Sequence, residues 1–236
     1  VDGVSFAIAK GQTLALVGES GCGKSTVARL LVGLHEATAG HVRFDGQDAS
    51  RTWRTPQGRV LRRRMQMIFQ DPYASLNPRW SVLDIVAEPL TEHGLVAGEA
   101  ALEDRVAELL QQVGLAAGDM VKFPHQFSGG QRQRIAIARA LALEPEIIIC
   151  DEAVSALDVQ VQAQVISLLA KLRRELGLAY LFIAHDLGVV RDFADRVVVM
   201  QSGKIVEQGP VQQIFERPRE TYTRNLLAAC LDPDPD

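Results

Sequence analysis

Eight consecutive residues have the types and the spacing of a loop that wraps the phosphates of a nucleotide. Glycines let such a loop turn tightly, and the N–H groups at the start of the following helix attract an anion. Among the eight, Lys24 would add a positive charge toward the terminal phosphates, and the hydroxyl of Ser25 would bind Mg²⁺. We therefore predict a nucleotide site here rather than a glycine-rich turn with a surface lysine. The run fits G-x-x-x-x-G-K-[ST] and is Gly18-Glu19-Ser20-Gly21-Cys22-Gly23-Lys24-Ser25, with Thr26 following.

An acidic pair, Asp151 and Glu152, directly follows the apolar run 147–150. Ligands of open parallel sheets bind at the carboxyl ends of the strands, which is where this pair would lie. Adjacent carboxylates at a strand end point to opposite faces, so the two can contact different groups and have different roles. We expect Asp151 to hold Mg²⁺ through water and Glu152 to polarise an attacking water. A solvated acidic loop is the alternative.

A second helix start could also bind an anion. It consists of Ser128, Gly129, Gly130 and Gln131, in which the serine would be the N-cap and the glycines would leave N–H groups exposed. Ordinary capping by serine is the alternative interpretation. One domain has little use for two separate phosphate sites, so we expect the second to bind the nucleotide of a facing partner.

The surrounding elements predict an α/β fold. Continuous apolar runs at 13–17, 147–150, 179–184 and 196–200 indicate a parallel sheet covered on both faces. A helix is predicted after the phosphate loop, with Val27, Leu30, Leu31 and Leu34 on its apolar face, and another over 161–176, ended by Gly177. Apolar spacing also predicts helices over 102–113 and 135–142, with no strand-like run between them.

The predicted organisation is thus a P-loop parallel-sheet core with an inserted helical subdomain. We expect the core to comprise residues 1–71 and 144–212, the helical subdomain 72–143, and a carboxyl-terminal tail 213–236.

Composition excludes several classes of protein. Lys plus Arg total 25 against 29 for Asp plus Glu, a net charge of −4, which argues against a dedicated nucleic-acid binder. Six arginines between residues 51 and 64 form a basic stretch that we interpret as a solvated face. Three widely spaced cysteines predict neither a disulfide framework nor a zinc site. No run is long enough for a membrane span, and no signal peptide is visible.

In order along the chain, these motifs resemble those of the ATP-binding-cassette (ABC) ATPases. The resemblance adds a glutamine loop at Gln70, an interface-crossing loop at 155–158 that ends in Asp158, and a switch histidine at His185. It implies ATP and Mg²⁺ as ligands, with Gln70 joining Ser25 and Asp151 at the metal, and His185 contacting the γ-phosphate. It also implies a head-to-tail pair of such domains, identical or different, in which Ser128–Gln131 of one faces the ATP of the other.

A narrower resemblance is to the ATPases of peptide-type importers, which serve dipeptide, oligopeptide, glutathione and nickel systems. It rests on 69–79, 123–127 and 151–158, and on Tyr222-Thr223-Arg224 with Leu226 and Leu227. Glu220-Thr221 replaces the usual His-Pro, Gln160 stands where serine is common, and Cys230 stands alone where some relatives carry a cysteine cluster.

This resemblance implies import of peptides or similar small solutes through separate integral membrane permease subunits, with a solute-binding protein involved indirectly. It places the chain peripherally at the cytoplasmic face of the inner membrane. The alternative, a soluble ABC ATPase of nucleic-acid or ribosome metabolism, would predict coiled-coil, zinc-bearing or basic insertions, and we expect no nucleic-acid partner. The solute, and whether the partner ATPase is identical, paralogous or fused, stay open.

The family stacks adenine on an aromatic residue upstream of the first core strand. The sequence starts at Val1, so we expect this aromatic to lie before it. Phe6 is the nearest candidate, but its place in the alternation of Val4–Ile8 predicts core packing. We therefore expect weaker ATP affinity than in a longer chain that retains the aromatic.

Overall fold

The centre of the structure is a six-stranded sheet covered by helices on both faces. The computed structural model describes residues 1–231, so the end of the predicted tail, 232–236, lies outside the described part. The strand order is β4-β5-β6-β1-β7-β8, in which the first five pair in parallel and β8 pairs antiparallel with β7. The strands are β1 (Thr13–Val17), β4 (Met65–Ile68), β5 (Ile147–Asp151), β6 (Ala179–Ile183), β7 (Arg196–Gln201) and β8 (Lys204–Pro210).

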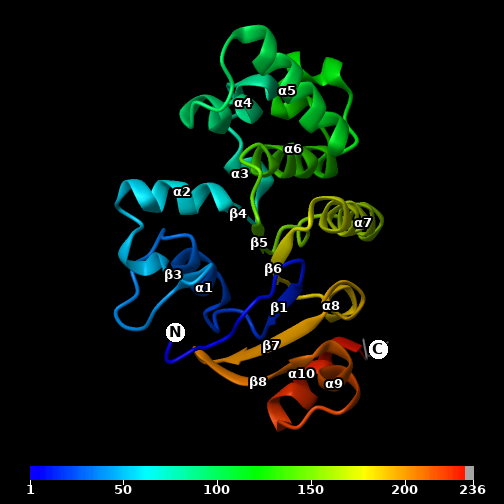
Figure 1. Ribbon diagram of the computed structural model, residues 1–236. Coiled ribbons are helices and arrows are strands. Elements are labelled where there is room, and N and C mark those ends of the chain that lie inside the picture. Colours follow the sequence, from blue (N-terminus) through cyan, green and yellow to red (C-terminus); the bar gives the residue numbers. More distant parts are fainter. Residues whose placement is uncertain (232–236) are drawn as a thin grey trace.

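Burial on both faces explains why the strands are apolar without alternation. Leu14 and Leu16 of β1 belong to a core cluster shared with α1 (Lys24–Leu31) and α2 (Pro56–Arg64). Ala15 and Val17 point the other way, into a cluster shared with α7 (Val159–Leu176) and α8 (Leu187–Phe193). Figure 1 shows α1 and α2 on one side of the sheet and α7 and α8 on the other. Phe6 packs against the first cluster, as expected.

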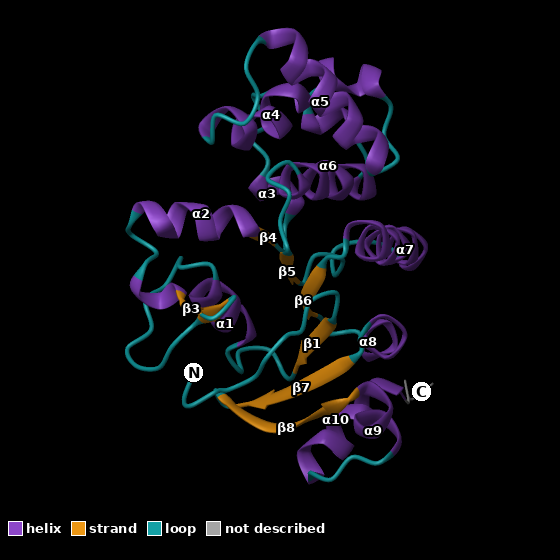
Figure 2. Ribbon diagram, viewed as in Figure 1, coloured by secondary structure: helices purple, strands orange, loops and turns teal. Residues whose placement is uncertain are grey.

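All regular secondary structure in residues 72–143 is helical. They form α3 (Pro72–Ser75), α4 (Val82–Glu92), α5 (Glu99–Gln112) and α6 (Gly129–Leu141), with 3₁₀ turns at Ala117–Val121 and Pro124–Gln126. Figure 2 shows this helical group beyond the β4 edge of the sheet, with no strand drawn among its described residues. The parallel-sheet core and its helical insert are thus present as predicted.

The remaining elements complete the edges of the molecule. They are the hairpin β2 (Arg43–Phe44) and β3 (Gln47–Asp48), a 3₁₀ turn at Ala49–Arg51, and the helices α9 (Val211–Glu216) and α10 (Thr221–Leu231). Within the described residues no helix combines the length and apolarity that a membrane crossing requires.

Some arginines of the basic stretch pair with nearby acidic groups. Arg64 pairs with Asp45 at 2.9 Å and with Glu146 at 2.6 Å. Arg54 pairs with Glu36, and both side chains are exposed. These contacts agree with the interpretation of a solvated face.

The first helix is shorter than its apolar spacing predicted. Leu34 lies beyond its end with 58% of its surface exposed, so the expected contribution of Leu34 to the apolar face was wrong. The reason is a glycine cap, because Gly33 adopts φ 73° and donates its N–H to the carbonyl of Leu30. Leu34 N–H in turn bonds to the carbonyl of Arg29, which closes the helix.

The start of α6 packs tightly against α7, and this close approach is testable. A Cβ at Gly130 would overlap Cγ1 of Val161, whereas a Cβ at Gly129 would meet only the flexible end of Leu157 at 3.3 Å. We expect Gly130→Ala to lower the free energy of unfolding by about 1–3 kcal/mol, measured by urea denaturation. The control Gly129→Ala should change it by less than about 0.5 kcal/mol. Equal losses in the two variants would contradict this packing.

Candidate functional site

The phosphate loop joins β1 to α1 in a conformation that requires glycine. Gly18 adopts φ 148°, and a Cβ there would overlap the carbonyl oxygen of Met200 on β7. Gly23 is the N-cap of α1 in the left-handed region, at φ 109°. Because glycine has no side chain, it leaves the first N–H groups of α1 without a side-chain cap. This geometry fits an anion at the start of the helix.

Lys24 is bonded to the loop that contains it. Its ammonium donates to the carbonyl oxygen of Gly18 at 2.7 Å and to that of Glu19 at 2.9 Å. The side chain is buried, with 4% of the residue exposed. The positive charge therefore lies within the loop.

Ser25 and Asp151 meet beside the helix start, as their proposed joint role at a metal requires. The hydroxyl of Ser25 donates to Oδ1 of Asp151 at 2.9 Å. Burial raises the pKa of Asp151, the hydrogen bond from Ser25 opposes that effect, and the charge of Glu152 adds to it. A hydroxyl and a buried carboxylate next to a phosphate-type loop are the donor set that suits Mg²⁺.

Glu152 lies between two other predicted site residues. Gln70, two residues after β4, donates its Nε2 to Oε2 of Glu152 at 2.6 Å. Nε2 of His185, two residues after β6, lies 2.5 Å from Oε1 of the same carboxylate. The structure thus brings Gln70, Glu152 and His185 together at the carboxyl ends of β4, β5 and β6. Their roles in catalysis stay predictions.

The backbone of Glu152 adopts an unusual conformation that its neighbours hold in place. Its φ of 52° lies in the left-handed region, which costs a non-glycine residue about 1–3 kcal/mol. The N–H of Glu152 donates to the carbonyl of Ile183 at 3.0 Å. The carbonyl of Glu152 accepts the hydroxyl of Ser155 at 2.9 Å. These contacts turn the carboxylate toward Gln70 and His185.

The predicted second anion site is the capped start of α6. Ser128 accepts the N–H of Gln131, and the Gln131 side chain accepts the N–H of Ser128. In Figure 1, α6 belongs to the upper helical group, whereas the phosphate loop lies lower, between β1 and α1. Asp158 likewise caps a helix, accepting the N–H of Val161 at the start of α7. Within this chain the structure does not bring Ser128–Gln131 to the phosphate loop.

One contact at the phosphate loop was not predicted from the sequence. The phenolic oxygen of Tyr222 on α10 accepts the N–H of Glu19 at 3.1 Å. Tyr222 was noted in the sequence only as part of a carboxyl-terminal motif. No local pattern signals a contact across 203 residues of sequence.

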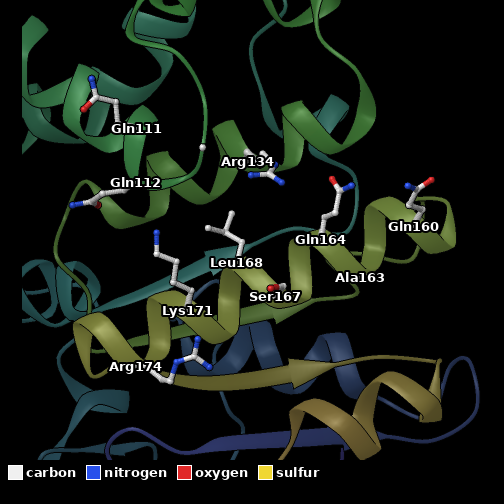
Figure 3. A pocket seen from close by; sticks show the side chains of 11 residues that line it. Gln111, Gln112, Arg134, Gln160, Ala163, Gln164, Ser167, Leu168, Lys171 and Arg174 are labelled. Carbon is white, nitrogen blue, oxygen red and sulfur yellow. The ribbon is translucent and has the colours of Figure 1, made fainter.

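A groove of about 750 Å³ lies elsewhere, between the α5–α6 pair and α7. Figure 3 shows Lys171 and Arg174 of α7 on one side of it and Arg134 of α6 on the other. Nη1 of Arg134 donates to the carbonyl of Val113 at 2.7 Å. None of the predicted site residues is among those that line this groove, so it is separate from the site.

Comparison with protein families gives a match over residues 1–155 to the family described as ABC transporter. The chain belongs to this family. It is 54% identical over 236 residues to the oligopeptide transport ATP-binding protein OppF of Bacillus subtilis, covering 100% of the chain and 77% of OppF. It is also 54% identical over 235 residues to the glutathione import ATP-binding protein GsiA of Salmonella typhimurium, covering 100% of the chain but only 37% of GsiA.

Solved ABC structures share the fold. One is cbiO1 of Clostridium perfringens, described as part of the ABC transporter complex cbiONQ, at 29% identity and a TM-score of 0.81, covering 91% of this chain and 83% of cbiO1. Another is the ATP-binding cassette MJ0796, described as a dimeric post-hydrolysis state bound to ADP and Pi. It has 32% identity and a TM-score of 0.76, covering 87% of this chain and 88% of MJ0796. The predicted ABC ATPase and its fold class are confirmed. None of the relatives named here is described as acting on nucleic acids or ribosomes.

The contact between Ser25 and Asp151 can be tested without nucleotide. Ser25→Ala should raise the pKa of Asp151 further, because the lost hydrogen bond opposes the effect of burial. Carboxyl-carbon NMR titration measures this pKa. Ser20→Ala, at an exposed position of the same loop, is the control and should leave it unchanged. An Asp151 that titrates identically in the parent protein and in Ser25→Ala would rule out the contact.

Proposed function

We propose that this chain binds and hydrolyses ATP to power the import of peptides or similar small solutes through separate permease subunits. The observation that carries the proposal is Glu152, whose two carboxylate oxygens are held by Gln70 and His185 beside the phosphate loop. A carboxylate oriented in this way can polarise a water toward a phosphoryl group bound at Lys24. The likeness to oligopeptide and glutathione import proteins supports the solute class.

The phosphates of ATP would bind the loop Gly18–Thr26. Lys24 would leave the carbonyl oxygens of Gly18 and Glu19 and bind the terminal phosphates. Ser25, Asp151 and Gln70 would hold Mg²⁺, which when bound neutralises charge on the phosphoryl group being transferred. His185, after releasing Glu152, would contact the γ-phosphate. Each of these roles is part of the proposal.

The active form would be a head-to-tail pair of ABC domains. Ser128–Gln131 lies apart from the phosphate loop of its own chain, so a partner is needed to bring the two together (Figure 1). A twofold arrangement would complete both sites at once, with the N–H groups of α6 directed at the partner's γ-phosphate and Asp158 at the interface. The dimeric state described for MJ0796 supports pairing of such domains. Loss of the γ-phosphate would then let the pair separate.

A permease subunit would bind beside Gln70. A groove of about 260 Å³ lies there between the core and the helical group, and Ile68, Phe69, Leu76 and Arg139 are among the residues that line it. Phe69 keeps 42% of its surface exposed, which suits a surface that a partner covers. Opening of the pair would move this groove and drive alternating access.

Bound to permease subunits, the chain would lie peripherally at the cytoplasmic face of the inner membrane. It would meet a solute-binding protein only indirectly.

Lys24→Ala tests the binding site. Removing the ammonium should abolish the nucleotide-dependent rise in melting temperature, because a ligand stabilises only the folded state that binds it. Differential scanning fluorimetry with and without ATP and Mg²⁺ measures this. Lys10→Ala, a surface change outside the loop, is the control and should keep the full rise. A normal rise in Lys24→Ala would mean that ATP binds elsewhere.

Glu152→Gln tests the hydrolytic step. We expect turnover to fall on the order of 10²–10⁴-fold while ATP binding persists, because only the activation of water is lost. The variant should accumulate as an ATP-bound dimer, detectable by size-exclusion chromatography with light scattering. Glu175→Gln, which removes an exposed carboxylate of α7, is the control and should turn over normally. Hydrolysis at the parent rate in Glu152→Gln would refute the role of Glu152.

A further inference from the structure

The carboxyl-terminal helix holds one residue of the phosphate loop. The hydroxyl oxygen of Tyr222 on α10 accepts the N–H of Glu19 at 3.1 Å. The carbonyl of the same Glu19 accepts the ammonium of Lys24 at 2.9 Å. Glu19 is therefore held through its N–H by α10 and through its carbonyl by the loop's own lysine.

A second contact holds the phosphate loop at Cys22, three residues after Glu19. The N–H of Gly203, in the turn between β7 and β8, donates to the carbonyl of Cys22 at 2.9 Å. Gly21 lies between Glu19 and Cys22 and adopts φ 80°, a conformation open to glycine but restricted for other residues. The segment from Glu19 to Cys22 is thus bounded on both sides by contacts from the chain beyond residue 200.

Tyr222 is itself fixed by buried groups. Glu207 of β8 is 8% exposed, and its carboxylate accepts the N–H groups of Arg219 at 2.9 Å and Glu220 at 3.1 Å, just before α10 begins. Burial works to raise the pKa of Glu207, but the hydrogen bonds that its carboxylate accepts outweigh burial and lower it. The ring of Tyr222 packs against the main core cluster, to which the buried Leu227 of the same helix belongs. The place of the Tyr222 hydroxyl is therefore set by the fold.

We propose that Tyr222 is a positioning residue of the ATP site, which presets the phosphate loop by holding Glu19 through its hydroxyl. Tyr222 acts through Glu19 and is not itself a phosphate ligand. A loop that is already ordered loses less conformational freedom when the triphosphate binds, so the contact favours binding. It makes α10 a functional part of the nucleotide site. The inference rests on the proposed function, because it requires that this loop binds ATP.

Tyr222→Phe is the matched test, because it removes one oxygen atom and keeps the ring. Loss of one neutral hydrogen bond changes an equilibrium constant by about 2- to 10-fold. We therefore expect the KM and the Kd for ATP with Mg²⁺ to rise by that factor. The kcat should stay within about twofold, because the hydroxyl assists the ground state and the transition state equally. Steady-state hydrolysis and calorimetry measure these constants.

Tyr180→Phe is the control, since it removes a hydroxyl that bonds to the carbonyl of Leu169 at 3.2 Å in the buried core. It should lower the melting temperature and leave the KM unchanged. An equal rise in KM in both variants would reduce Tyr222 to a general structural role and overturn the inference. An unchanged KM and Kd in Tyr222→Phe would overturn it as well.

A measurement without ATP separates this inference from the proposed function. Hydrogen exchange followed by NMR should show the Glu19 amide exchanging more slowly in the parent protein than in Tyr222→Phe. Equal exchange in the two proteins would remove the contact on which the inference depends. A parent chain with a protected Glu19 amide that nevertheless binds no ATP would overturn the proposed function and the positioning role with it. A parent chain that binds ATP no more tightly than Tyr222→Phe would overturn the positioning role alone.

Discussion

Parallel pairing of β1, β4, β5 and β6 is the constraint on which the site depends. Because these strands run the same way, the segments that follow them emerge at one edge of the sheet. The phosphate loop follows β1, Gln70 follows β4, Glu152 follows β5 and His185 follows β6. Gln70 and Glu152 are 82 residues apart in the sequence, yet their side chains bond at 2.6 Å. A slip of one residue in the register of β4 against β5 would separate them.

Elements with a strong local pattern could be predicted, and those without one could not. The runs at β1, β5, β6 and β7 are recognisable because burial on both faces leaves their centres almost entirely apolar. The edge strand β4 was not predicted, because it has four residues and Gln66 interrupts its apolar run. Leu34 was assigned to a helix face because spacing alone cannot reveal that Gly33 ends the helix first.

The same distinction applies to the site. Residues 18–25 form a contiguous motif, so their chemistry could be predicted from types and spacing. The meeting of Gln70 and His185 on a single carboxylate depends on three loops and on the left-handed backbone of Glu152. The contact of Tyr222 with Glu19 depends on how α10 returns to the sheet, which the buried Glu207 helps to determine. Such contacts are set by tertiary packing, and no local pattern encodes them.

The bonding of Lys24 has a consequence for what the loop accepts. Its ammonium is buried and donates to two neutral carbonyl oxygens. An incoming molecule must offer that cation a better partner than two amide dipoles before it can settle. Under the proposed function a chain of phosphates would be such a partner, whereas an uncharged nucleoside would offer the ammonium no negative charge. On this proposal, the contacts of a single side chain would favour charged ligands over uncharged ones.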